Sequence, residues 1–203
     1  MPSPLGHVLA GAAVAWASDL VPGDRAWRAA PRTAPWYERA GGRLTLTCAL
    51  LAAAPDLDLL LPGMHRSWTH SVTAGVTAGV VAAVVARLSG GVPRLHARRI
   101  AFMCAAAWGS HLLLDWLGAD PAPPFGIQAL WPFSHRWFMS GWDLLPVTER
   151  RHPLSAAAMR INIRTAVTEI GVLGPIALAL WLVRVKALAG LASKLAGRDH
   201  PPE

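Results

Sequence analysis

Histidine and carboxylate side chains recur at short spacings along a chain that is otherwise strongly apolar. In "HLLLD", His111 and Asp115 are four residues apart, so on a helix they share one face and can hold one metal ion together. The same pair can also form a hydrogen bond that ties down a helix end. The spacing therefore leaves a metal-ligand pair and a structural pair equally open.

Two more motifs add carboxylates and imidazoles. "PDLD" provides Asp56 and Asp58, which a regular helix would point about 200° apart, so both serve one site only if the helix frays or each faces a different ion. "HRSWTHS" provides His65 and His70 in a compact turn. At the end of this turn, Ser71 is better explained as an N-cap of the next helix than as a catalytic residue.

Four single residues extend this set. His7 lies in the first apolar segment and Glu169 near the start of the last, where a satisfied buried histidine and a capping acid are the common roles. Arg66 could neutralise a phosphate or carboxylate of a substrate, or it could be an ordinary exposed arginine. His135 in "WPFSHRWF" can join the set, although an interfacial aromatic belt explains it better.

The composition of the chain points to a membrane. Its 203 residues suit one domain, predicted at residues 1–190 and followed by a polar tail at residues 191–203. Hydrophobic residues make up 53% and charged residues 15%, whereas soluble domains have about a quarter charged residues. The 19 Lys and Arg residues form short clusters between apolar runs rather than an aromatic-lined basic face, so direct nucleic-acid binding is not expected.

Five apolar segments predict the helices that position these side chains. A helix needs about 20 residues to cross about 30 Å of hydrocarbon, and all but the first segment approach that length. Their Ala, Val and Leu residues lie all round, which favours a membrane over a soluble bundle, and "GVTAGV" favours close helix packing. The prediction is an all-α, polytopic membrane helical bundle with polar loops and about four to five transmembrane helices. The segments are residues 4–17, 44–61, 72–88, 100–117 and 166–185.

The charges around these segments predict which helix ends share a side. If all five segments cross, 13 of the 19 Lys and Arg residues fall on one side, which the positive-inside rule places in the cytoplasm. The ionisable residues in or beside the segments then all fall at the non-cytoplasmic face. Such groups mark function by default, so the convergence predicts one site. It contains His7, Asp56, Asp58, His65, His70, His111, Asp115 and Glu169.

The donor atoms of this predicted cluster indicate a divalent-metal cofactor. Mixed nitrogen and oxygen donors suit zinc, with manganese or iron as alternatives, better than they suit calcium or magnesium. The set has more ligands than one tetrahedral site uses and enough for two ions, and we expect one or two ions to be bound.

The order of the motifs resembles a known family. An N-terminal His, "PDLD", "HRSWTHS", "HLLLDW" and "WPFS" follow one another as in the bacterial inner-membrane metal-dependent hydrolases (YdjM-like proteins), a family also described as binding the LexA repressor. The resemblance covers residues 1 to about 175 and implies a multi-pass inner-membrane protein with a divalent-metal site and a regulatory protein partner. The "HxxxD" pairing is also similar to that of zinc-dependent phospholipases C and nucleases, which implies phosphoester hydrolysis. The matching positions are His7, Asp56, Asp58, His65, His70, His111 and Asp115, with Glu169 a weaker match.

The residues and the resemblance together predict metal-assisted hydrolysis of a phosphoester or a similar ester. Because the site is predicted at the membrane interface, a lipid or lipid-linked ester is favoured over a soluble substrate. Asp56 and Asp58 would bridge or flank the ions, Asp58 or Glu169 would act as general base, and Arg66 would meet an anionic substrate. Two alternatives remain open. One is a non-enzymatic membrane protein whose metal site is structural or regulatory and binds a partner, and the other is a small transporter with a metal or proton relay.

Overall fold

The computed structural model describes residues 1–21, 34–60, 65–90, 94–150, 152 and 154–196. Over these ranges the chain is helical, and its only extended pairing consists of two isolated bridges, Gly118 with Leu145 and Ile127 with Phe138. The helical elements are α1 (Pro4–Ser18), α2 (Trp36–Ala40), α3 (Gly42–Ala53), η2 (Ala54–Leu60), η3 (Trp68–His70), α4 (Val72–Gly90), α5 (Arg94–Leu117) and α6 (Ala156–Ala196).

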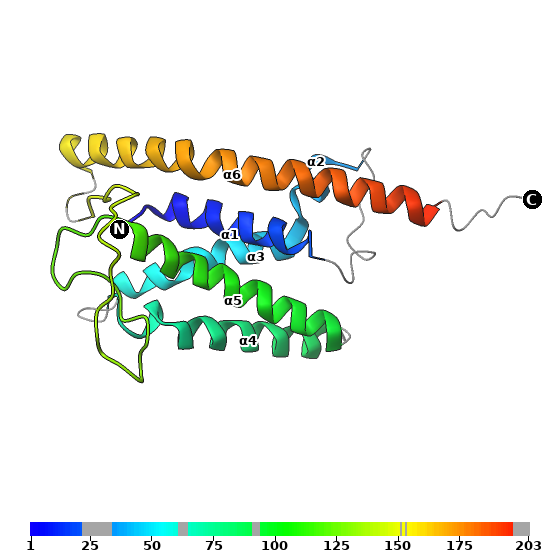
Figure 1. The fold of residues 1–203 in the computed structure, drawn as a ribbon, viewed down its shortest axis with the longest axis horizontal. Helices are drawn as coiled ribbons and strands as arrows, with labels where there is room; N and C mark the ends of the chain where they lie inside the picture. Colours follow the sequence, from blue (N-terminus) through cyan, green and yellow to red (C-terminus); the bar gives the residue numbers. More distant parts are fainter. Residues whose placement is uncertain (22–33, 61–64, 91–93, 151, 153, 197–203) are drawn as a thin grey trace, which may run out of the picture.

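The central helix of the bundle is α1, which packs against α3, α5 and α6 (Figure 1). Helix α5 also contacts α3 and forms an antiparallel pair with α4. Close approach of α1 to α3 depends on Gly11, where an added Cβ would lie 2.5 Å from the carbonyl oxygen of Cys48. Small residues thus let backbones meet where larger side chains would hold them apart.

Three of the described helices are long and apolar enough to cross a membrane, at Val72–Ser89, His96–Leu117 and Ala156–Gly190. The predicted all-helical membrane fold is therefore confirmed. Helices α1 and α3 are shorter, with 15 and 12 residues. Helix α6 begins ten residues before the apolar segment predicted for it and continues to Ala196, so it includes part of the predicted polar tail. The rest of that tail lies outside the described residues.

The small residues of "GVTAGV" pack α4 against α5, as the sequence predicts. A Cβ added at Gly79 would lie 2.5 Å from the carbonyl oxygen of Ala101 and 2.9 Å from the Cβ of Ala105. One turn earlier, Gly75 faces the indole of Trp108. The backbones of α4 and α5 therefore approach so closely at Gly79 that a side chain there would force them apart.

The connection between α5 and α6 folds over the end of the bundle where α1 begins and α5 ends (Figure 1). Its backbone is tied down by hydrogen bonds from Val72 N to Ala129 O (2.9 Å) and from Thr148 N to Met1 O (3.1 Å). Aromatic side chains remain exposed on it, including Phe133 at 90% and Trp142 at 67%. His135 is exposed in the same stretch, consistent with the aromatic belt that the sequence favours for it.

The opposite end of the bundle is closed by a buried ion-pair cluster. Asp19, the C-cap residue of α1, accepts a hydrogen bond from Arg184 Nε of α6 at 2.6 Å. Arg99 of α5 donates to the carbonyl oxygen of Ser18 at 2.5 Å and lies 3.4 Å from Asp19. Because two guanidinium groups meet the C-terminal end of α1, the cluster also complements the helix dipole.

Candidate metal centre

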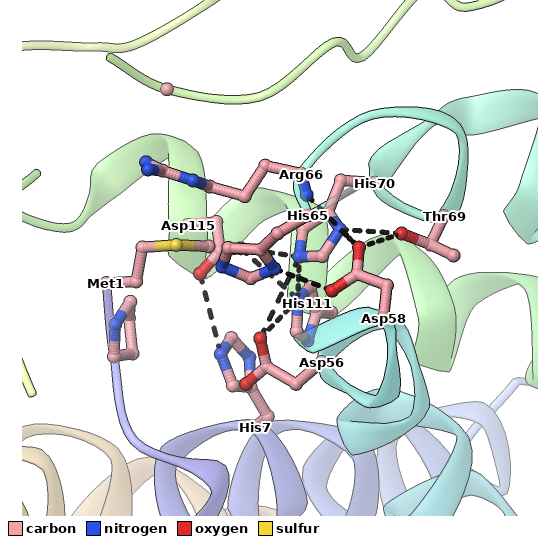
Figure 2. A network of polar contacts seen from close by, with 12 residues as sticks. Met1, His7, Asp56, Asp58, His65, Arg66, Thr69, His70, His111 and Asp115 are labelled. Carbon is pink, nitrogen blue, oxygen red and sulfur yellow. Dashed lines mark hydrogen bonds and ion pairs between the residues drawn. The ribbon is translucent and has the colours of Figure 1, made fainter. Parts of the chain in front are cut away.

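Seven of the eight residues predicted to share a site meet at one end of the bundle (Figure 2). They come from helix ends that are far apart in the sequence, namely the first turn of α1, η2, the turn around η3, and the last turns of α5. Each lies close to the position where its helix ends or begins, so the bundle brings the separate motifs together at one end. The seven are His7, Asp56, Asp58, His65, His70, His111 and Asp115.

Four donor atoms of this group converge on one point. The Nε2 atoms of His70 and His111 lie 3.0 Å apart, and each lies within 3.3 Å of Asp115 Oδ2. Asp56 Oδ1 completes the set at 3.9 and 4.0 Å from the same two nitrogens. Tetrahedral ligands at 2.0–2.1 Å from a zinc ion are about 3.4 Å apart. Five of the six distances among the four atoms are 3.0–4.0 Å, which is the range expected of ligands around one metal ion.

The remaining lone pairs of the cluster support the same assignment. Both ring nitrogens of His7 and both carboxylate oxygens of Asp115 are buried without a hydrogen-bond partner. His7 Nε2 faces Asp115 Oδ1 at 3.5 Å, and its ring stacks on His111 with centroids 3.8 Å apart. A buried polar atom without a partner costs about 1–3 kcal/mol, and more when it is charged. An ion coordinated by these atoms would remove that cost.

The imidazole rings are held so that Nε2 faces the centre. His111 Nδ1 lies 2.8 Å from the carbonyl oxygen of Ala52, and since a carbonyl only accepts, Nδ1 carries the proton. His70 Nδ1 lies 3.2 Å from Asp58 Oδ2. Hydrogen bonds of this kind fix the ring and the tautomer of metal-binding histidines.

Asp58 makes contacts with the surrounding turn through both of its oxygens. Oδ1 lies 2.6 Å from His65 Nδ1, and Oδ2 accepts from the Arg66 backbone N–H at 3.1 Å and from the Thr69 hydroxyl. Burial alone would raise the pKa of Asp58, but hydrogen bonds with His65, His70 and Thr69 outweigh it and hold that pKa well below its usual range. Asp58 is therefore ionised and organises the "HRSWTHS" turn.

His70 lies between two carboxylates, and its pKa reflects them. Burial would lower the pKa of His70, but the neighbouring carboxylates of Asp115 and Asp58 outweigh burial and raise it to about 9. Without a metal ion, the His70 ring thus carries a proton near neutral pH. This proton lies among the same donor atoms that would surround a metal ion.

The start of α4 fixes the other side of this turn. The Ser71 hydroxyl accepts from the Ala74 N–H at 3.1 Å and donates to the Trp68 carbonyl at 2.6 Å, so the predicted N-cap is present. Trp108 of α5 donates its indole N–H to the Thr69 carbonyl at 2.9 Å. The turn that carries His70 is thereby bound to both α4 and α5.

A cavity of about 380 Å³ opens beside the cluster and includes His65 and two arginines in its lining. The guanidinium of Arg66 pairs with Asp120, and Arg150 pairs with both oxygens of Asp56 at 3.2–3.3 Å. Asp120 and Arg150 are missing from the sequence prediction. They lie 54 and 94 residues from their partners, in a connection without periodicity, and no pattern in the sequence indicates these contacts.

The eighth predicted residue, Glu169, has a separate set of partners. It is fully buried in α6, and its carboxylate accepts from the Ser3 backbone N–H at 2.6 Å and from the Ser3 hydroxyl. Ser3 is the N-cap of α1, so the acid lies at the positive end of that helix. Glu169 thus holds the segment that carries His7.

Comparisons with known proteins place the chain in a family. No curated protein and no solved structure matches it. A family model described as "YdjM inner membrane protein" matches residues 1–191, which is nearly the whole chain and includes every residue of the cluster. The resemblance that the motifs indicate is confirmed, and the chain belongs to the YdjM inner membrane protein family.

Proposed function

We propose that this protein is a membrane-bound, metal-dependent hydrolase that cleaves a phosphoester or a lipid-linked ester. The observation that carries the proposal is the cage of His70, His111, Asp115 and Asp56 atoms at one end of the bundle. A cavity with two arginines adjoins it. Buried ligands beside an accessible cavity are the arrangement that hydrolytic metal sites require.

The primary ion would be held by His70 Nε2, His111 Nε2, Asp115 Oδ2 and Asp56 Oδ1. The unpartnered atoms of His7 and Asp115 Oδ1 provide donors for a second ion. The mixed nitrogen and oxygen donors favour zinc, with manganese or iron as alternatives. A divalent ion in this site would lower the pKa of a water molecule and polarise the substrate ester.

Proton transfer is assigned to His65. Its Nδ1 is bound to Asp58 Oδ1, so Nε2 is the ring atom that exchanges a proton with the cavity. Asp58 fixes the orientation of His65 and His70 instead of acting as the base, because both of its oxygens already accept hydrogen bonds. An imidazole oriented by a carboxylate is a common arrangement for general acid–base catalysis.

The substrate is proposed to be a membrane lipid with an anionic group. The cluster lies where α4 begins and α5 ends, and both helices are candidate membrane spans, so it would be level with lipid headgroups. Arg66 and Arg150 line the cavity and are suited to a phosphate. The distribution of Lys and Arg in the sequence supports an outward-facing site, in the inner membrane of a bacterium.

A reconstituted system tests this function. The purified full chain is placed in vesicles of phosphatidylglycerol and phosphatidylethanolamine, loaded with zinc or manganese, and the lipid products are identified by mass spectrometry. We expect metal-dependent cleavage that a chelator abolishes and that His65→Ala slows by about 10²–10⁴-fold. His135→Ala is the control, because His135 is exposed on the long connection. Metal-loaded protein that leaves both lipids intact would count against hydrolysis of these phosphoesters.

A further inference from the structure

A second cavity, of about 510 Å³, runs along the side of the bundle between α3 and α4. Both of these helices pack on α5, and Trp108 of α5 lines the cavity between them. On the α4 side the lining consists of alanine, threonine and valine side chains, among them Ala74, Ala78 and Ala82. We call this cavity the α3–α4 groove.

The three threonine hydroxyls and the Trp108 indole N–H of the groove already have hydrogen-bond partners within the protein. The hydroxyls of Thr47, Thr73 and Thr77 donate to the carbonyl oxygens of Arg43, Trp131 and Thr73 at 2.8–3.0 Å. The indole N–H of Trp108 donates to Thr69 at 2.9 Å. A ligand in the groove would thus find few polar partners there. Because burying a polar group without a partner is costly, the groove selects hydrocarbon.

One end of the groove lies next to the metal centre. Trp68 lines the groove and is followed directly by Thr69 and His70. Trp131 lines the same end, and its carbonyl accepts from Thr73 in the first turn of α4. A chain in the groove would therefore have its polar end near the "HRSWTHS" turn.

The size of the groove fits a single hydrocarbon chain. Its α4 lining extends from Thr73 to Val85, which is about 18 Å at the helical rise per residue. Half of a bilayer's hydrocarbon core is about 15 Å.

We infer that the α3–α4 groove binds one acyl chain of a membrane lipid and presents the headgroup of that lipid to the metal centre. The inference rests on the proposed function only in taking this lipid as the substrate. Binding of the chain itself needs no hydrolysis and no metal ion.

Photolabelling tests the inference. The full chain is reconstituted in phosphatidylglycerol nanodiscs that contain a phosphatidylglycerol with a diazirine on one acyl chain, and adducts are mapped by mass spectrometry. We expect adducts concentrated on groove residues such as Leu51 and Trp108, with few on lipid-facing positions such as Val183, which is 54% exposed. Ala78→Trp fills the groove and should remove most groove adducts. Val80→Trp is the matched control, because Val80 is on α4, 55% exposed and outside the groove lining.

The possible outcomes distinguish acyl-chain binding in the groove from hydrolysis at the metal centre. Groove adducts that persist in metal-free His70→Ala support the groove even if no variant hydrolyses lipid, in which case only the proposed function fails. Lower lipid turnover in Ala78→Trp with unchanged metal content supports both. If adducts are spread evenly over α4 and α6, and are equal in Ala78→Trp and Val80→Trp, the groove does not bind an acyl chain and the inference is wrong. Efficient disulfide crosslinking of Ala78→Cys between two chains would overturn it as well, because a second copy would then occupy this face.

Discussion

His70 and His111 face each other through their Nε2 atoms, 3.0 Å apart, in the buried interior of one end of the bundle. His111 has its proton on Nδ1, which donates to Ala52, so its Nε2 is an acceptor. In the metal-free protein, the proton that keeps His70 charged can lie between the two nitrogens. A metal ion at this point would take the place of that proton.

The first prediction concerns pH. Because the pKa of His70 is raised to about 9, its ring is protonated in the metal-free protein at any lower pH. Metal ligands bind in the deprotonated form, so binding must release this proton. We expect metal affinity to rise by about tenfold per pH unit up to about pH 9 from this group alone. Calorimetric titration in buffers of different ionisation enthalpy measures the released proton, and a binding constant independent of pH would contradict the arrangement.

The second prediction concerns Asp58→Asn. This substitution keeps the size of the side chain but removes the charge that orients His65 and His70. Removing such an orienting group typically costs about 10–100-fold in metal affinity. Competition with a chromogenic chelator measures this affinity, and Asp143→Asn is the matched control because Asp143 is exposed. Complete loss of metal in Asp58→Asn would contradict the orienting role and indicate that Asp58 binds the metal ion directly.

The third prediction separates two roles for Glu169. If the acid holds the N-terminus of α1 through Ser3, Glu169→Gln weakens a charge-assisted contact and lowers stability by about 1.5–3 kcal/mol. Metal content should stay near that of the wild type. Unfolding in detergent and metal analysis on the same sample provide both values. Loss of turnover without loss of stability would instead support the general base predicted from the sequence.

The fourth prediction concerns the far end of the bundle. Asp19→Asn leaves Arg184 buried at 3% exposure without its carboxylate. Breaking a buried pair by removing one partner typically costs about 3–5 kcal/mol. Detergent unfolding should show this loss while metal content per folded chain is unchanged. A stability equal to that of wild type would mean that this cluster contributes little to the bundle.

The position of the site could be predicted from sequence because it depends on helix ends. Apolar segments give approximate helix boundaries, and alternating crossings put the end of α5 beside the start of α1. His7 and Asp115 are therefore found together although they are far apart in the chain. The four-residue spacing of His111 and Asp115 similarly predicts a shared face, and their atoms lie 3.2 Å apart.

The division of roles within the site could not be predicted in this way. A regular helix would separate Asp56 from Asp58, but η2 is a 3₁₀ segment, and the two carboxylates lie on opposite edges of the His70 ring. Which of them faces the centre depends on Arg66, whose backbone has φ 66° and donates to Asp58. It also depends on Arg150, which holds Asp56 from a distant loop. Neither contact leaves a periodic signal in the sequence.

Metal content tests the central claim most directly. The wild type, His70→Ala, Asp115→Ala and His135→Ala are purified from the membrane in parallel, and metal per chain is measured by mass spectrometry after the helix content of each is checked by circular dichroism. We expect near-stoichiometric metal in the wild type and in His135→Ala, and almost none in the other two. Near-stoichiometric metal in folded His70→Ala and Asp115→Ala would contradict the assignment of the site.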